Sequence, residues 1–421
     1  MKKSIVLFLF LLPVFHIYAA KLSKEAIVLT RASSHGDLQT VKRMVESGTD
    51  VDAKEGFGKT GLALACIKGH FKIVKYLLKH GADPNSKDKN GFTPFMESIH
   101  AGHFNIAEYL LKHGADINAR NHNSETMLLI SIKHKDTGAA TFLLEHGAAP
   151  NTGDKKGLFP LHFAIRNHDI KAVNLLIRHK ANLISHAGNG SPLVFATIKY
   201  NFLEALKVFV KNNKNVLKLR KSKDKNTLLI EAAAAERPNF MKFLIEQGVD
   251  PNETNRQTRT ALAVAAQLGK LRSVMFLIEQ AHTKTDALTK NNWTPLLEAI
   301  HAKHFDIAEY LLNHGADINA QNKDGNTILM TASAAGNPDD VKYLISKNAK
   351  INKRGKRGAT ALMLAVFRGH LKVVKFLVKS GADLNVRLKN SLVYNGTTAL
   401  DIAKKMHFKE IERFLKSKGA R

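Results

Sequence analysis

The stretch NGFTPFMESIHAGHFNIAEYLLKHGADIN, residues 90–118, has the pattern of two short helices joined by tight turns. Thr93 is placed to cap the first helix, because its hydroxyl can accept a hydrogen bond from a backbone N–H that otherwise has no partner. Pro94 follows at the first helical position, where its missing N–H costs nothing. Gly102 and Gly114 stand where the two helices must end and the chain must turn. The stretch therefore predicts one helix-turn-helix repeat.

The same repeat recurs along the chain, in most cases at a step of 33 or 34 residues, and a threonine marks the start of its first helix. The threonines are Thr60, Thr93, Thr126, Thr227, Thr260, Thr294, Thr327, Thr360 and Thr398. Phe159 and Ser191 take the two missing positions, and one more repeat begins near residue 27. A period of this length indicates a stack of repeats, because one repeat cannot bury its apolar face alone. We therefore expect an all-α solenoid of about twelve helix-turn-helix repeats.

Two steps are longer than the others, and both add residues to the loop that follows a second helix. The step from Ser191 to Thr227 is 36 residues, and the step from Thr360 to Thr398 is 38. The first long step divides one continuous array into repeats 1–6, residues 25–222, and repeats 7–12, residues 223–421.

Four segments share a longer pattern, in which a Gly-His turn or its equivalent precedes an apolar helix and then Gly-Ala-Asp-x-Asn. They are KGHFKIVKYLLKHGADPN (68–85), AGHFNIAEYLLKHGADIN (101–118), AKHFDIAEYLLNHGADIN (302–319) and RGHLKVVKFLVKSGADLN (368–385). With the Thr-Pro start, this pattern resembles the ankyrin repeat, and the resemblance covers essentially everything from about residue 25 to 421. It implies a curved stack of helix pairs with hairpin loops along one edge, which serves as a scaffold for binding another protein.

The N-terminus has the layout of a Sec-type signal peptide over residues 1–20. Two lysines precede an apolar run from Ile5 to Val14, and the small residues Ala19 and Ala20 follow. The run is shorter than the ~20 apolar residues that span a bilayer. We therefore expect export, to the periplasm or outside the cell, with an uncleaved membrane anchor as the alternative. Such a leader on a Lys- and Asn-rich array resembles secreted ankyrin-repeat proteins of host-associated bacteria.

Positive charge dominates the composition and is densest in two segments, 211–226 and 350–358, where hairpin tips are expected. The chain has 64 Lys and Arg against 36 Asp and Glu, a formal net charge of +28, which favours anionic partners. The basic candidates for partner binding are Lys211, Lys214, Lys218, Arg220, Lys221, Lys223 and Lys225, followed by Lys353, Arg354, Lys356 and Arg357. A solvated surface without a ligand is the competing interpretation. Trp293 is a further candidate, either as an exposed contact or as a residue that packs on the neighbouring repeat.

We expect a monomeric, non-catalytic scaffold that binds another protein. An acidic partner would complement the positive charge of the basic loops. The alternative is a binder of polyanions, either nucleic acid or an anionic membrane surface, through those loops. Few aromatic residues accompany them, so stacking on single-stranded bases is poorly supported. An enzyme with an unrecognised site is the residual alternative.

No pattern of catalytic, cofactor-binding or metal-ligating residues stands out, and we expect none of these sites. Gly58-Lys59-Thr60 lacks the first glycine of a phosphate-binding loop, since Ala53 stands at that position. Four histidines recur once per repeat near the end of the second helix: His80, His113, His146 and His179. Helices of neighbouring repeats pack ~8–10 Å apart, so these rings are too widely spaced to share a zinc ion. The single cysteine, Cys66, lies in an apolar stretch and is expected to be buried.

Overall fold

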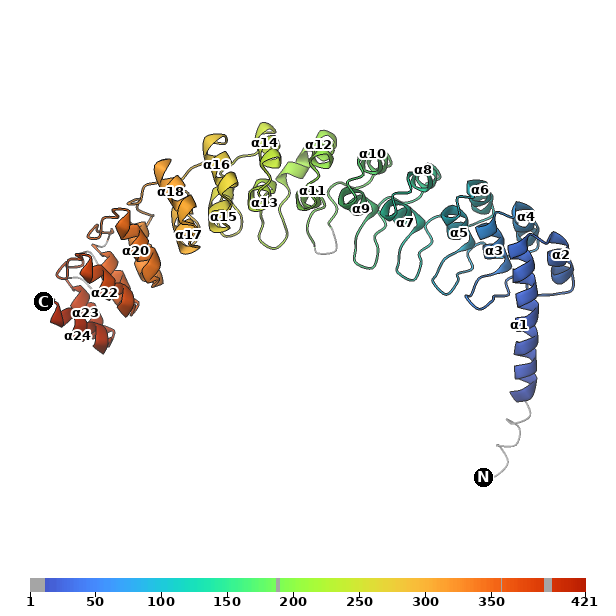
Figure 1. Cartoon of the computed structure of the whole chain (residues 1–421), viewed down its shortest axis with the longest axis horizontal. Helices are drawn as coiled ribbons and strands as arrows, with labels where there is room; N and C mark the ends of the chain where they lie inside the picture. The colour runs from blue at the N-terminus through green and yellow to red at the C-terminus, as the bar shows by residue number, and fades with distance from the viewer. Residues whose placement is uncertain (1–11, 187–189, 357, 390–395) are drawn as a thin grey trace, which may run out of the picture. The chain divides into compact units, whose positions relative to one another are not determined.

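The computed structural model of the chain describes residues 12–186, 190–356, 358–389 and 396–421. Within these residues the chain is a succession of short helix pairs, and its β-structure is confined to isolated bridges in the hairpin loops (Figure 1). The chain divides into two compact parts, Met1–Val208 and Phe209–Arg421, which we call the first half and the second half. The expectation of an all-α stack of helix-turn-helix repeats is confirmed.

In the first half, odd-numbered helices open the repeats and even-numbered helices close them. The helices are α1 (Leu12–His35), α2 (Leu38–Glu46), α3 (Gly61–Lys68), α4 (Phe71–Lys79), α5 (Pro94–His100), α6 (Phe104–Lys112), α7 (Met127–Lys133), α8 (Thr137–Glu145), α9 (Pro160–Arg166), α10 (Ile170–Arg178) and α11 (Val194–Lys199). The boundary between the halves lies inside α12 (Leu203–Asn212).

The second half opens with a short 3-10 helix, η1 (Lys214–Lys218), and continues with the same alternation of helices. These are α13 (Leu228–Ala234), α14 (Pro238–Glu246), α15 (Ala261–Gln267), α16 (Leu271–Glu279), α17 (Pro295–His301), α18 (Phe305–Asn313), α19 (Ile328–Ala335), α20 (Pro338–Ser346), α21 (Ala361–Phe367), α22 (Leu371–Lys379), α23 (Ala399–Lys405) and α24 (Lys409–Ser417).

The first helix is longer than the sequence pattern predicts. α1 begins at Leu12, whereas we expect a start near residue 27. Pro13 is tolerated in a first turn, and no glycine or further proline follows before Gly36, so nothing in the sequence stops the helix. The C-terminal part of α1 packs against α3, with Leu29 fully buried. None of the helices in the described part of the chain has both the length and the hydrophobicity needed to cross a bilayer.

The repeating threonines are helix caps, as expected. Each of the nine accepts a hydrogen bond on its hydroxyl from the backbone N–H three residues later. Thr93, for example, accepts from the Met96 N–H at 3.3 Å and is fully buried. The cap therefore satisfies a donor that water cannot reach.

The two substitutes for threonine behave differently. Phe159 is the N-cap of α9 but makes no side-chain cap bond. The N-cap of α11 is Leu193, so the expectation that Ser191 fills a capping position is wrong. Pro192 takes the bridge position in this hairpin, opposite His186, that capping threonines such as Thr126 take in theirs. The extended segment before α11 therefore continues past Ser191, and the helix starts two residues later than the threonine spacing predicts.

Within each half, side-chain amides connect several repeats to the next. Asn118 accepts a hydrogen bond on Oδ1 from the Ala149 N–H at 2.8 Å. In the second half, Asn319 accepts from the Lys350 N–H, also at 2.8 Å. The last residue of the Gly-Ala-Asp-x-Asn pattern thus satisfies a backbone donor in the following repeat, which holds neighbouring hairpins in register.

Candidate binding surfaces

A polar pocket of about 380 Å³ lies in the first half, where three successive repeats converge. Lys59 Nζ lies 2.8 Å from Asp88 Oδ2 and also contacts the Glu97 carboxylate. Lys133 Nζ lies 2.5 Å from Glu125 Oε1 on the other side of the pocket. Because each ammonium group faces a carboxylate, the fixed charges of the pocket largely offset one another.

The buried pairing also shifts the protonation of these groups. Burial alone raises the pKa of Asp88, but the hydrogen bond from Lys59 and those from the Phe92 and Asn90 N–H groups outweigh it, so the pKa lies below the usual value. Burial lowers the pKa of Lys59, and its two carboxylate partners reverse this effect, so that the pKa lies above the usual value. Both groups are therefore charged near neutral pH, and the pair is a fixed feature of the surface.

The rim of this pocket is free to contact a partner. His100, Asn123 and His134 line the pocket and are exposed, while Phe92 is half-buried beside them. None of these four residues is among the partner-binding candidates predicted from the sequence. The pocket could have been located from charged residues at fixed distances from the capping threonines. Lys59 stands one residue before Thr60, and Glu97 stands four residues after Thr93.

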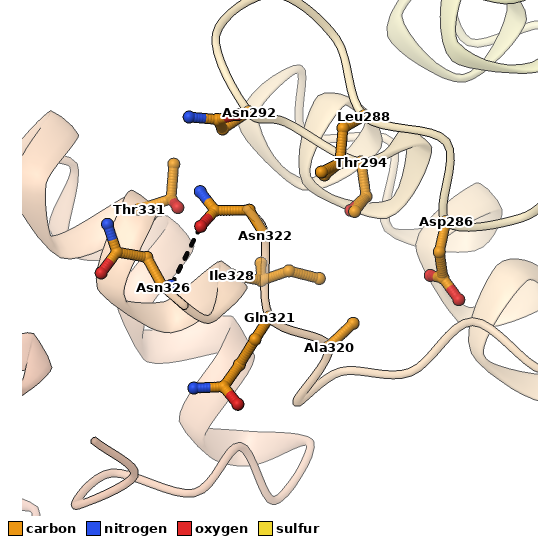
Figure 2. A pocket seen from close by; sticks show the side chains of 10 residues that line it. All are labelled: Asp286, Leu288, Asn292, Thr294, Ala320, Gln321, Asn322, Asn326, Ile328 and Thr331. Carbon is orange, nitrogen blue, oxygen red and sulfur yellow. Dashed lines mark hydrogen bonds between the residues drawn. The ribbon is translucent and has the colours of Figure 1, made fainter. Parts of the chain in front are cut away.

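A smaller pocket of about 70 Å³ lies in the second half between two successive hairpin loops, as Figure 2 shows. Its lining is mostly amide and hydroxyl, and Asn322 accepts a hydrogen bond on Oδ1 from the Asn326 N–H at 3.0 Å. Asp286 is the one carboxylate in the lining, and partial burial followed by the charge of Asp317 raises its pKa. The volume is well below the ~300–1,000 Å³ typical of small-molecule sites. The pocket has room for a few water molecules.

The basic segment 211–226 does not form a single hairpin tip, contrary to expectation. Lys211 lies in the last turn of α12, and Lys214 and Lys218 lie in η1. Asn213 caps η1 by accepting from the Asn215 N–H, and burial of Val216 holds the 3-10 helix against the repeats. The extra residues of this long step are thus partly folded into a helix.

The charges of this segment are also partly neutralised. Arg220 Nη2 lies 3.0 Å from Glu253 Oε1, and Lys221 Nζ lies 2.9 Å from Glu231 Oε2. The remaining basic side chains of the segment are exposed: Lys211, Lys214, Lys218, Lys223 and Lys225. The structure therefore does not gather all seven predicted residues on one surface.

The second basic segment lies in a hairpin, as expected, and contacts the hairpins on both sides. Lys353 Nζ donates to the Asn319 carbonyl at 2.8 Å, and Lys356 Nζ donates to the Lys323 carbonyl at 2.6 Å. Arg354 Nη2 donates to the Arg387 carbonyl at 3.2 Å. Arg357 lies outside the described residues.

Trp293 is half-buried and packs within its own repeat. Its ring meets the His301 ring edge to face, with centroids 4.8 Å apart. His301 Nδ1 lies 2.8 Å from Oδ2 of the buried Asp340 in the next repeat, and Asn337 Nδ2 donates to the other oxygen at 2.8 Å. Trp293 thus contacts a residue of its own repeat, and His301, rather than Trp293, reaches the next repeat.

The recurrent histidines have a structural role at helix ends. His80 Nδ1 lies 2.8 Å from the Tyr76 carbonyl, and its ring stacks on Tyr76 with centroids 4.0 Å apart. His113 and His146 repeat both contacts with Tyr109 and Phe142. The described residues contain no group of three or more metal-ligating side chains placed to hold an ion.

The lone cysteine is buried, as expected. Cys66 is fully inaccessible within α3, and this burial raises the pKa of its thiol far above the usual range. A thiol in such a site is protonated at neutral pH and shielded from oxidants.

Comparison with known families agrees with the repeat pattern. A family model described as "Ankyrin repeats (3 copies)" matches residues 29–121, 119–187, 229–322, 316–388 and 355–421. The matched ranges leave out residues 188–228, which include the first basic segment.

Curated proteins with similar sequences match over short stretches. Ankyrin repeat domain-containing protein 53 of Homo sapiens is 37% identical over 98 residues, which are 22% of this chain and 18% of that protein. Alpha-latrocrustotoxin-Lt1a of Latrodectus tredecimguttatus is 31% identical over 99 residues, 24% of this chain and 7% of that protein. SH3 and multiple ankyrin repeat domains protein 2 of Homo sapiens is 30% identical over 135 residues, 32% of this chain and 7% of that protein. The chain thus spans less than a fifth of each of these relatives.

Proposed function

Since the chain belongs to the ankyrin-repeat family, we propose that it is a non-catalytic scaffold that binds another protein. The proposal is supported chiefly by the pocket that three repeats form in the first half. Its floor is a set of mutually paired charges, and its rim is a row of exposed polar side chains. A surface of this kind can form hydrogen bonds with a macromolecular partner and complement its shape along several repeats at once.

The rim residues provide the direct test. In the double variant His100→Ala, His134→Ala, both side chains are exposed and line the pocket, so the fold should be unchanged. The matched control is His113→Ala, His146→Ala, which removes two histidines that are exposed at the ends of α6 and α8. Partners are captured with the full chain by crosslinking and identified by mass spectrometry. A reduced capture of a specific protein by the first variant, and not by the control, supports the proposal.

We further propose that the partner is acidic and that the chain acts as a monomer. The net charge of +28 supports the first statement, because complementary charge accelerates association and disfavours basic partners. Capture repeated at low and high salt tests it: an acidic partner is lost as the salt concentration rises. Light scattering of the purified chain tests the second statement, and a mass twice that of one chain contradicts it.

Export is a separate part of the proposal and rests on the N-terminal sequence. The lysine pair, the apolar run and the small residues up to Ala20 support a Sec-type leader. N-terminal sequencing of the expressed protein should find a chain that begins at Ala20 or Lys21. A full-length chain recovered with membranes indicates an uncleaved anchor instead, and one recovered in the soluble cytoplasmic fraction rules out export.

A further inference from the structure

Three successive hairpin loops of the second half bring together six basic residues, which we call the three-hairpin patch. They are Lys323, Lys353, Arg354, Lys356, Arg387 and Lys389. Hydrogen bonds from side chain to backbone link the loops in both directions. Lys356 reaches back to the Lys323 carbonyl, and Arg354 reaches forward to the Arg387 carbonyl. The patch is therefore built into the stack and is independent of the 211–226 segment.

Glycine fixes where two of these lysines lie. Gly325 has a φ of +72°, and a Cβ at this position would lie 2.6 Å from the Lys356 nitrogen and 2.7 Å from its Cγ. Lys356 can therefore pack directly over the preceding hairpin only because residue 325 has no side chain. Gly358 likewise allows Lys389 of the third hairpin to pack over the second hairpin. The Lys389 nitrogen lies 3.1 Å from the position that a Cβ of residue 358 would take. The backbone thus sets these lysines one repeat apart.

Among the described residues the charges of the patch are not held in ion pairs, although the charge of Arg387 helps to lower the pKa of Asp401. By contrast, Arg220 and Lys221 in the other basic segment each face a glutamate. Four of the six side chains of the patch, those of Lys353, Arg354, Lys356 and Arg387, each use one N–H in a bond to a carbonyl, and a lysine has three N–H donors and an arginine five. The side chains are therefore held in place with most of their donors unused, which lowers the entropy lost on binding an anion.

The shape and composition of the patch narrow the class of ligand. Its cations lie on successive repeats ~10 Å apart, so it extends over about 20 Å. Among the described residues of the second half, the exposed large apolar side chains are Leu268, Met275, Phe305 and Phe367, and all lie outside these hairpins. The described residues of these hairpins thus offer a single strand no aromatic ring to stack on and a bilayer no exposed apolar anchor. An extended ligand whose charge lies along its backbone satisfies these conditions.

We propose that the three-hairpin patch binds the phosphate backbone of double-stranded nucleic acid without regard to base sequence. Duplex DNA presents one charge per ~1.7 Å of its axis, so about 20 Å of duplex offers many phosphates to the six cations. Arginine and lysine donors directed at phosphates position a duplex but do not read its bases. This activity does not depend on the protein scaffold function proposed above.

Binding of the full chain to two 30-base-pair duplexes of unrelated sequence, measured by fluorescence anisotropy at several salt concentrations, tests the proposal. The patch variant is Arg354→Ser, Lys356→Ser, Arg387→Ser. The control, Lys214→Ser, Lys218→Ser, Lys223→Ser, removes the same charge from exposed positions in the other segment. Equal melting temperatures for the three proteins establish that each is folded.

The expected result is equal affinity for both duplexes, a loss of tenfold or more in the patch variant, and a small change in the control. The slope of log K against log salt should also become shallower by about 0.9 for each phosphate contact removed. The charge-retaining variant Arg354→Lys should keep most of the affinity. An equal loss in both triple variants overturns the proposal, because it indicates a response to net charge alone. Binding to anionic vesicles or heparin with none to duplex overturns it as well.

Discussion

Arg259 and Glu298, 39 residues apart in the chain, form an ion pair across two repeats of the second half. Arg259 Nε lies 3.0 Å from Glu298 Oε1, and the glutamate side chain is only 2% exposed. The arginine also donates from Nη1 to Gln267 Oε1 at 3.0 Å. Burial raises the pKa of Glu298, and the charge of Arg259 only partly counteracts this effect. Burial thus penalises the charged form of Glu298, and the arginine limits that penalty.

Arg259→Ala should destabilise the second half by about 2 kcal/mol at pH 7, because it leaves a buried carboxylate without its partner. The pKa of Glu298 is raised in the folded state, so the folded protein binds the extra proton first as the pH falls. Without Arg259 this pKa rises further, so the penalty is complete above the folded-state pKa of the variant and has disappeared below that of the wild type. Thermal unfolding of wild type and variant between pH 4 and pH 8 measures this.

The double variant Arg259→Ala, Glu298→Gln is the control for this prediction. It removes the buried charge as well as its partner, so most of the lost stability should return at pH 7 and the pH dependence of the difference should vanish. A double variant that is as unstable as the single one would show that the arginine acts through packing rather than charge.

Asp52→Asn should stabilise the first half by about 0.5 kcal/mol at neutral pH. Asp52 takes the position that asparagines such as Asn118 take elsewhere, and both of its oxygens accept from the Asp83 N–H, at 3.0 and 3.1 Å. Burial, followed by the charges of Asp83 and Asp50, raises its pKa. An amide oxygen keeps the bond without the charge, so the gain should be present above the folded-state pKa and disappear as the pH falls through it.

A rise in melting temperature at pH 7 that shrinks near pH 4 is the expected observation for Asp52→Asn. Asp52→Ala is the comparison that isolates the hydrogen bond, since it removes both the charge and the acceptor and leaves the Asp83 N–H without its partner. If the asparagine and alanine variants melt together, the acceptor at this position contributes nothing. An asparagine variant that is no more stable than wild type at pH 7 contradicts the argument from charge.

Phe159→Thr should restore a missing helix cap. Phe159 is the N-cap of α9 with an extended backbone, φ −89° and ψ 161°, close to the values at Thr126, but its ring accepts no hydrogen bond. Threonine and valine have the same shape, so Phe159→Val loses the same ring contacts without adding an acceptor. Phe159→Thr should therefore be more stable than Phe159→Val by about 1 kcal/mol, measured by chemical denaturation. Equal stability would mean that the hydroxyl does not cap the helix.

The repeat pattern could be predicted from sequence because its signals are local. A threonine cap depends on a backbone N–H three residues away, so Thr93 and Met96 can be placed without knowledge of any other repeat. The prediction that Ser191 caps a helix was wrong for an equally local reason, which the regular spacing of the threonines concealed. Its neighbour Pro192 takes the bridge position opposite His186, and the helix starts later. Periodicity located the hairpin but did not fix its register.

The candidate surfaces depend on contacts between repeats. The number of basic residues in a segment therefore did not predict where these surfaces lie. The 211–226 segment is among the most basic stretches of the chain, yet Arg220 is paired with Glu253 of the next hairpin loop and Lys221 with Glu231 of α13. Lys356 stands in a shorter basic run but donates to a carbonyl 33 residues earlier and faces no carboxylate among the described residues. Which charges remain unpaired depends on how neighbouring loops stack. The composition of a single loop gives no information about that stacking.

Gly69→Ala should be more destabilising than Gly102→Ala, although both glycines have a φ of +76°. The backbone strain of an alanine at this φ is the same at both positions and costs about 1 kcal/mol. At Gly69 the added Cβ would also lie 2.7 Å from the His103 ring of the next repeat, whereas at Gly102 no atom lies within 4 Å. The difference in unfolding free energy between the two variants therefore measures the contact between successive Gly-His turns. When both glycine substitutions are made in a His103→Ala background, the difference should vanish, because the Cβ at residue 69 then has space. An unchanged difference would place the cost in the backbone alone.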